Sequence, residues 1–359
     1  MESILRRALR RVVRPPRPDG GLLLVGDAVG WILDDVSLQL ARHLPADLHC
    51  RTAPAEWQRA RNCTIHLIDR AWAWSDGMLD PIDPSNRLIG VWWHGRLDSP
   101  DPIIQAALER LRRHHDRFAM LQVTCSSGRE TLAALGVPAT KVVLLPLGVD
   151  LTTFRPVPDT AARHTARRLL GIRDEAVAIG CFQKDGNGWG EGAEPKLIKG
   201  PDVFVDALSR LHRRYPVHAV IPGPARGYVK RGLEAAGVPF SAPGMVPRET
   251  LPRLYHALDL YCSPSRDEGG PAGALEAMAC GIPVVSTRTG IPADLIEPGV
   301  SGVLADVDDP DSLTAAAAVL IESPSFRARA ARAGLERIEA YDWKRLATRY
   351  VDELYTPAQ

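Results

Sequence analysis

One stretch, residues 259–286, constrains the fold of this chain more than any other. It reads DLYCSPSRDEGGPAGALEAMACGIPVVS. A short apolar run at 260–262 and a second at 283–285 flank a segment whose apolar side chains recur at helical spacing, before a stop at Gly281. This pattern predicts a strand, a loop, a helix and a second strand. The stretch is therefore one βαβ unit, and it predicts an α/β fold.

The loop before this helix contains the candidate ligand-binding residues. Gly269 and Gly270 let the backbone approach a ligand closely, and Pro271 suits the first helical position, where its missing N–H costs nothing. The helix end attracts anions, and Glu268 and Glu276 place two carboxylates beside it. That set suits a sugar nucleotide, with N–H groups for phosphate and carboxylates for hydroxyls. An ordinary βα loop, with Glu268 solvated and Glu276 capping, is the alternative.

The string from Glu268 through seven residues to Glu276, followed by AMACGIPVV, resembles the donor-site signature of the retaining glycosyltransferases of family four. The resemblance covers most of the chain and is strongest from about residue 120 onward. It implies the GT-B fold, in which two Rossmann-like domains face each other across a cleft. It also implies that a C-terminal helix crosses back to the first domain.

The domain organisation follows from length and from this resemblance, since 359 residues allow two domains. Asp150, Phe154 and Pro156 fit the family's exit from its first domain, and residues 342–355 place apolar side chains on one helical face. We expect four parts: a basic N-terminal arm at 1–18, an acceptor-side domain at 19–160, a donor-binding domain at 161–340, and the crossover helix at 341–359.

Composition excludes several classes of protein. A net charge of +1 does not support a nucleic-acid partner. The six cysteines are scattered without a CxxC pair, which indicates reduced thiols in a cytoplasmic protein. The sequence has no apolar run long enough to span a membrane and no signal-peptide pattern.

The N-terminal arm, MESILRRALRRVVRPPRP, interleaves six arginines with apolar residues at helical spacing. One interpretation is a basic amphipathic helix that lies on an anionic membrane surface, at the inner face of the membrane. The other is a solvated arm, or a helix packed on the body of the protein.

Two candidate sites fall in the first domain. Gly26, Asp27 and Gly30 follow the first predicted strand, where relatives carry a glycine-rich loop against acceptor and donor phosphates; a plain tight turn is the alternative. His94 follows the strand predicted at 88–93. It resembles the family's histidine that faces the donor sugar, although a lone histidine is often structural.

The donor domain holds the expected phosphate-binding cations. Relatives have an arginine after the first strand of this domain and a lysine before a glycine further on. Lys199 and Gly200 match the second element. Lys184 is the candidate for the first, with Lys196 as a rival, and a flexible surface loop with solvated lysines is the alternative for the whole stretch. Val246 lies in the segment that contacts the nucleobase in relatives.

No metal site and no cofactor are expected. Asp306, Asp308 and Asp309 cluster in the sequence, but the stretch has the pattern of a turn into the next helix, and GT-B enzymes generally need no metal.

Together with these features, the resemblance implies a metal-independent, hexosyltransferase-like enzyme that transfers a sugar from a UDP- or GDP-sugar with retention of configuration. Its acceptor would be a glycan, a lipid-linked saccharide or a small molecule, in cell-surface polysaccharide or glycolipid biosynthesis. Lys199 and Lys184 would stabilise the leaving phosphate, Glu276 would hold ribose hydroxyls, and Glu268 and His94 would contact the donor sugar. Two alternatives remain: a nucleotide-sugar epimerase of the same fold, and a non-catalytic nucleotide-sugar-binding subunit.

Overall fold

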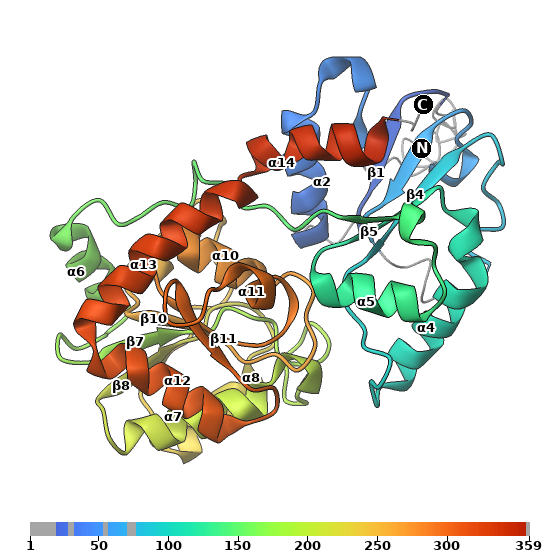
Figure 1. Cartoon of the computed structure of the whole chain (residues 1–359). Helices are drawn as coiled ribbons and strands as arrows, with labels where there is room; N and C mark the ends of the chain where they lie inside the picture. The colour runs from blue at the N-terminus through green and yellow to red at the C-terminus, as the bar shows by residue number, and fades with distance from the viewer. Residues whose placement is uncertain (1–18, 28–31, 53–56, 70–76, 357–359) are drawn as a thin grey trace, which may run out of the picture.

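The computed structural model describes residues 19–27, 32–52, 57–69 and 77–356. The predicted arm at 1–18 and Gly30 lie outside the described residues. Figure 1 shows two domains, each built on one sheet with helices against it. Both sheets are parallel and six-stranded, which confirms the predicted α/β class.

The first sheet has the strand order β2-β1-β3-β4-β5-β6. Its strands are β1 (Leu22–Val25), β2 (Arg51–Thr52), β3 (Thr64–Leu67), β4 (Arg87–Trp92), β5 (Met120–Val123) and β6 (Val142–Leu144). Its helices are α2 (Ile32–His43), α4 (Pro102–His114) and α5 (Ser126–Ala134).

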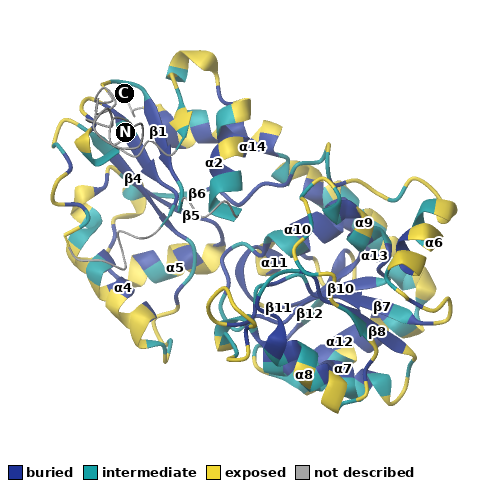
Figure 2. Ribbon diagram, turned by 180° about the vertical axis from the view of Figure 1, so that it is seen from behind, coloured by how far each residue is buried: buried dark blue, intermediate teal, exposed yellow. Residues whose placement is uncertain are grey.

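Strand β1 shows why these residues form a central strand. Leu22 and Leu24 pack in the cluster that contains residues of α2, whereas Leu23 and Val25 pack in the cluster that contains residues of α4. Successive side chains of a strand point to opposite faces, and both faces of this sheet are covered. Figure 2 shows the same arrangement in each domain, with buried strands inside and exposed helix faces outside. The LLLV run is therefore apolar at every position.

The second sheet has the order β12-β11-β10-β7-β8-β9. Its strands are β7 (Val177–Gly180), β8 (Val217–Val220), β9 (Phe240–Ser241), β10 (Leu260–Ser263), β11 (Val284–Thr287) and β12 (Gly302–Ala305). Its helices are α6 (Thr160–Leu169), α7 (Pro201–His212), α8 (Gly227–Ala235), α9 (Leu251–His256), α10 (Ala272–Ala279), α11 (Gly290–Leu295), α12 (Pro310–Glu322) and α13 (Pro324–Ile338). Strands β10 and β11 pair in parallel, with Tyr261 opposite Val284, so the predicted βαβ unit is confirmed.

The C-terminal segment crosses back to the first domain, as predicted. Helix α13 belongs to the second domain, and α14 (Trp343–Tyr350) lies beside α2 of the first (Figure 1). The regular helix ends at Tyr350, earlier than the helical pattern of 342–355 suggested, and Val351–Tyr355 forms a wider π turn. Among the described residues, no helix combines the length and the apolar character that crossing a membrane requires.

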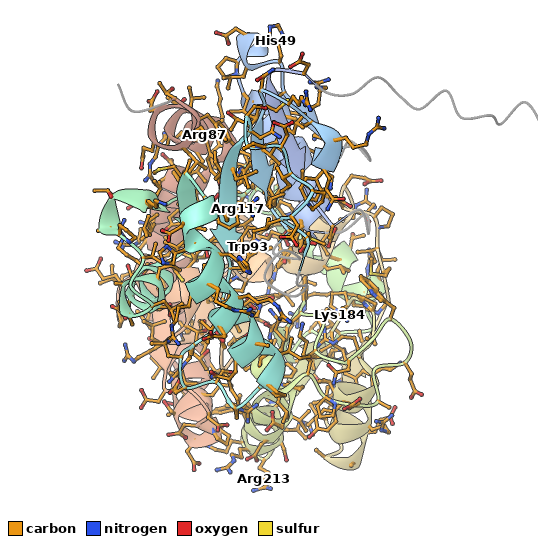
Figure 3. The ribbon with its side chains drawn as sticks, turned by 90° about the vertical axis from the view of Figure 1, so that its right-hand side faces the viewer. His49, Arg87, Trp93, Arg117, Lys184 and Arg213 are labelled. Atoms are coloured by element: carbon orange, nitrogen blue, oxygen red, sulfur yellow. The ribbon has the colours of Figure 1, made fainter. Side chains whose placement is uncertain are left out.

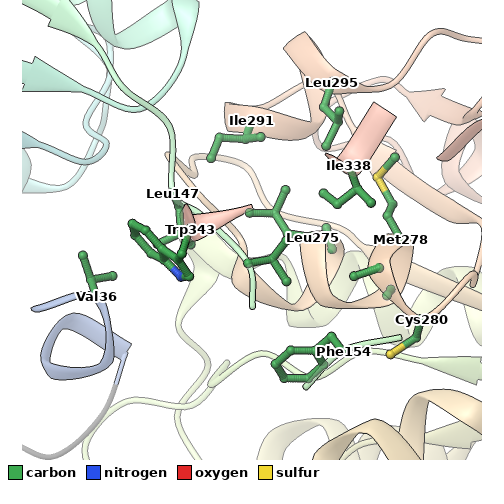
Figure 4. Close-up of a cluster of buried hydrophobic side chains, with 14 of the residues drawn as sticks. Val36, Leu147, Phe154, Leu275, Met278, Cys280, Ile291, Leu295, Ile338 and Trp343 are labelled. Carbon is green, nitrogen blue, oxygen red and sulfur yellow. The ribbon is translucent and has the colours of Figure 1, made fainter. Parts of the chain in front are cut away.

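One hydrophobic cluster runs between the domains. It brings Val36 of α2 and Trp343 of α14 together with Leu147, Leu275 of α10 and Ile291 of α11 (Figure 4). Helix α10 is therefore held by residues of both domains, and its N-terminal end lies where the domains meet.

Candidate functional site at the domain interface

The loop between β10 and α10 lies at the carboxyl end of the second sheet, the edge where α/β folds place ligands. Pro271 caps α10, with φ −72° and ψ 95°, and its carbonyl accepts the Ala274 N–H at 2.9 Å. The prediction that Pro271 is the first helical residue is wrong by one position, because its extended ψ keeps it outside the helix. The first-turn N–H groups of Ala272 and Gly273 have no intrahelical acceptor, as in any helix.

Gly269 brings this loop against the first domain. A Cβ at Gly269 would clash with the carbonyl oxygen of Trp93, which follows β4, and with the Thr124 hydroxyl, which follows β5. Figure 3 shows Trp93 at the level where the two domains meet. Only glycine permits this approach. Gly269, which the sequence analysis assigned to close contact with a ligand, therefore also allows close contact between the two domains.

Glu268 and Lys199 form an ion pair across this loop. Glu268 is only 7% exposed, and burial by itself would raise the pKa of its carboxyl. The positive charges of Lys199 and His94 outweigh burial and hold the pKa of Glu268 below its usual range. Two predicted site residues that lie 69 positions apart in the sequence thus meet.

Gly200 makes this pairing geometrically feasible. It has φ +63°, and a Cβ there would clash with the carbonyl oxygen of Pro264 at the end of β10. Lys199 therefore ends its short 3₁₀ turn pressed against the β10 loop.

Both candidates for the second phosphate-binding cation lie near this pair. Lys184 Nζ donates to the Gly186 carbonyl at 3.4 Å and lies 5.0 Å from the centroid of the Trp189 ring. Burial, and then the charge of Lys199, lower the pKa of Lys184. The charge of Lys196 in turn acts on Glu268. Figure 3 shows Lys184 on the second domain.

The glycine-rich loop between Lys184 and Lys196 makes an ion pair and backbone hydrogen bonds with the rest of its domain. Asp185, at its start, forms a buried ion pair with Arg226 at 2.9 Å. Further along, the Glu191 and Gly192 carbonyls accept the N–H groups of Gly227 and Tyr228 at 2.7 and 2.8 Å. These bonds oppose the interpretation of the loop as a flexible surface segment.

His94 faces this site from the first domain, as the sequence predicted. Its Nδ1 lies 3.9 Å from Asp267 Oδ2, and the same oxygen accepts the Arg96 N–H at 3.2 Å. Burial acts to raise the pKa of Asp267, but its interactions with His94 and with the backbone of Gly95 and Arg96 leave the pKa below its usual range. Sequence reasoning missed Asp267, although its position directly before Glu268 was the available signal.

Glu276 has a separate set of partners. Its Oε2 accepts the Tyr255 hydroxyl at 2.6 Å, and its Oε1 accepts from Arg248 at 3.3 Å. Burial raises the pKa of Glu276 above its usual range in spite of both partners. Neither Arg248 nor Tyr255 was a sequence candidate. Arg248 lies only two residues after Val246, which is half-buried in the segment that follows β9.

The remaining residues that the sequence singled out have other surroundings. Gly26 and Asp27 follow β1, and a Cβ at Gly26 would clash with the Asp34 side chain. Of the three clustered aspartates, Asp308 pairs with Arg266 at 2.8 Å and Asp309 caps α12 by accepting the Ser312 N–H at 2.9 Å. No group of side chains in the described part of the chain has the composition of a metal site.

A pocket of about 470 Å³ opens beside Glu268. Its polar lining comes from both domains, with Arg96, Ser127 and Thr131 from the first and Glu268, Arg288 and Thr289 from the second, and Leu97 and Ala134 add apolar surface. The arginines are already paired, Arg96 with Asp98 at 2.6 Å and Arg288 with Asp306 at 3.5 Å. The pocket therefore offers hydrogen-bonding groups suited to hydroxyls.

Comparison with known proteins relates part of the chain to a family. Residues 194–337 match the model of the glycosyl transferases group 1. The chain is 30% identical over 297 residues to a D-inositol 3-phosphate glycosyltransferase of Kribbella flavida, covering 78% of the chain and 62% of that relative. It is 28% identical to a GDP-mannose-dependent alpha-(1-6)-phosphatidylinositol monomannoside mannosyltransferase of Mycolicibacterium smegmatis, covering 70% of the chain and 65% of that relative. The chain thus spans less than two thirds of the length of these curated relatives.

Solved structures show the same fold. Anabaena HepE in complex with UDP and glucose superimposes with a TM-score of 0.73 at 17% identity, over 94% of this chain and 99% of that one. Sucrose-phosphate synthase from Thermosynechococcus elongatus gives a TM-score of 0.71 at 18% identity, over 94% and 98% of the two chains. The predicted GT-B architecture is confirmed, and residues 194–337 belong to the glycosyl transferases group 1.

Proposed function

We propose that this chain is a retaining glycosyltransferase that moves a hexosyl group from a nucleotide-sugar to a hydroxyl acceptor. One observation carries the proposal: the ion pair of Glu268 with Lys199, which lies beside the N-terminal end of α10 and faces His94 of the opposite domain. A buried carboxylate next to a cation and a helix end suits a ligand whose sugar hydroxyls lie next to its phosphates.

The reaction breaks the bond between the anomeric carbon and the phosphate oxygen, and it forms a bond from that carbon to the acceptor oxygen. The acceptor proton passes to the departing phosphate, which leaves from the face that the acceptor attacks. Lys199, one of Lys184 and Lys196, and the end of α10 stabilise the negative charge on the phosphate. Because these groups supply the positive charge, we propose that transfer needs no divalent cation.

Glu268 and His94 contact the donor sugar, and Glu276 accepts hydrogen bonds from the ribose. The donor is a UDP- or GDP-sugar, since HepE binds UDP and glucose and the mannosyltransferase relative is named for GDP-mannose. The pocket beside Glu268 supports a hydroxyl-rich acceptor such as a glycan, a lipid-linked saccharide or a small polyol.

The test is a transfer assay with UDP- and GDP-hexoses and a panel of polyol and glycan acceptors, with and without EDTA. Glu268→Gln and His94→Ala should each lower kcat/KM by about 100-fold. Glu297→Gln is the matched control, because this exposed glutamate pairs with Arg337 away from the site. Release of an isomerised sugar without acceptor would indicate an epimerase. Nucleotide binding without turnover would indicate a binding subunit.

We also propose that the arm at 1–18 brings the enzyme to an anionic membrane surface, on the basis of its six arginines and its apolar spacing. Cosedimentation with vesicles that contain anionic lipid should fall when residues 1–18 are deleted and when salt is raised. Equal binding by the full and truncated chains would reject this role.

A further inference from the structure

Arg248 connects the two domains at the candidate nucleotide site. Its guanidinium lies 3.1 Å from Asp35 Oδ2 on α2, and it donates to Glu276 Oε1 on α10 at 3.3 Å. The guanidinium also lies 5.0 Å from the centroid of the Phe154 ring, in the segment between the two sheets. One cation thus bridges a helix of the first domain and the helix that carries Glu276.

This bridge satisfies two carboxylates that would otherwise repel each other. Glu276 is 6% exposed, and the negative charge of Asp35 acts on it to raise its pKa. Burial raises the pKa of Asp35 as well, and Arg248 opposes that shift. An arginine suits this position better than a lysine, because its planar guanidinium can reach two acceptors with different N–H groups.

The bridge also fixes the orientation of Glu276. Tyr255 holds one carboxylate oxygen at 2.6 Å and Arg248 holds the other at 3.3 Å. Each oxygen has a second lone pair with which it can accept from a further donor. A ribose hydroxyl can therefore bind a carboxylate that is already oriented, which reduces the ordering cost of binding.

We propose that Arg248 is a positioning residue that presents Glu276 to the ribose of a nucleoside diphosphate and, through Asp35, ties the nucleotide site to the first domain. This inference rests on the proposed function, which gives Glu276 the ribose. It predicts that Asp35, on the opposite domain, supports nucleotide affinity, and that this support requires Arg248.

The test is calorimetric titration of UDP and GDP into the full chain and four variants: Arg248→Met, Arg248→Lys, Asp35→Asn and the Arg248→Met/Asp35→Asn pair. Arg248→Met should weaken binding about 10- to 30-fold, as expected for loss of a hydrogen bond to a charged group. Arg248→Lys should recover part of that loss, and Asp35→Asn should weaken binding about three-fold. In the double variant Asp35→Asn should weaken binding no further, and it should restore part of the affinity because it removes the carboxylate that repels Glu276. Arg214→Met is the control, since this exposed arginine pairs with Glu322 on the far side of the domain.

If Arg248 only stabilised the fold, its variants would unfold more easily, and the effect of Asp35→Asn on nucleotide binding would not depend on Arg248. Unfolding midpoints identify any variant that is simply unstable. If Arg248→Met binds as the parent does, or if Asp35→Asn weakens binding equally in both backgrounds, the proposal is overturned. If the parent binds neither nucleotide, the ribose role of Glu276 fails together with the proposed function.

Urea denaturation of the nucleotide-free protein separates these two failures. Arg248→Met and Asp35→Asn should each lower the free energy of unfolding, and the two losses should not add in the double variant, because each breaks the same bridge. Additive losses would overturn the bridge between the domains whatever the nucleotide result.

Discussion

Two seams join the domains, and they are built differently. The crossover seam consists of Trp343, Tyr350 and Tyr355, which are 1%, 1% and 5% exposed and pack on the first domain. The cleft seam consists of polar bridges, such as Arg248 to Asp35, whose side chains are 33% and 21% exposed. Buried aromatic packing is worth several kcal/mol, whereas partly exposed ion pairs contribute little. The crossover seam therefore contributes more to holding the domains together, while the contacts of the cleft seam are of the kind that a polar ligand can replace.

The largest expected effect is at Trp343. Its indole lies against Gly148, where an added Cβ would clash with the ring. Trp343→Ala should lower the free energy of unfolding by about 3–5 kcal/mol, since it leaves a cavity between the domains. Urea denaturation followed by circular dichroism measures this change. Trp189→Ala is the control, because Trp189 is 55% exposed. A cost below about 1 kcal/mol would show that the seam is not a centre of stability.

At the candidate site within the second domain, Lys199→Met should affect both stability and binding. It leaves Glu268 buried without its cation, so the pKa of Glu268 should rise and stability should fall by about 3 kcal/mol. Nucleotide affinity should fall at the same time, because the proposed phosphate contact is lost.

The double variant Lys199→Met/Glu268→Gln separates the two consequences of that change. Removing the unpaired charge should restore most of the unfolding free energy, but it should not restore nucleotide affinity. If affinity returned with stability, Lys199 would serve the fold and not the phosphate.

The crossover seam should also respond to pH through His66. Burial holds the pKa of His66 at about 3, and its Nδ1 lies 2.9 Å from the Tyr355 hydroxyl. Below about pH 6.5 His66 binds a proton in the unfolded chain but not in the folded chain. The free energy of unfolding should therefore fall as pH drops from 6.5 toward 3. Between pH 6 and 4.5 the loss should be roughly 2 kcal/mol.

Denaturation curves of His66→Gln over the same pH range measure this effect. The variant should show a flatter dependence on pH, whereas the exposed His164→Gln should follow the parent. If the curves of the parent and His66→Gln run parallel, His66 is not the group responsible.

The sequence could predict those parts of the site that lie within one local pattern, but not the contacts between distant segments. The βαβ unit, Glu268 and Glu276 lie within one local pattern, so they could be found by spacing alone. Lys199 was placed by resemblance, since relatives have a lysine before a glycine here, but its pairing with Glu268 depends on the packing of the loops after β7 and β10. Arg248 carried no local signal, because its partner Asp35 lies on the other domain, 213 residues away in the sequence (248 − 35).

The smallest expected effect is a helix cap that crosses between the domains. Asp294 on α11 accepts the Ser126 N–H at 2.7 Å, at the first residue of α5, whose own N-cap Cys125 makes no side-chain cap bond. Asp294→Ala should therefore cost about 1 kcal/mol in urea denaturation, as the loss of a helix cap does. Asp294→Asn keeps an acceptor oxygen and should cost less than half as much. If the two variants lose equal stability, the negative charge at the helix end stabilises the contact, and raised salt should then diminish the difference between Asp294→Ala and the parent.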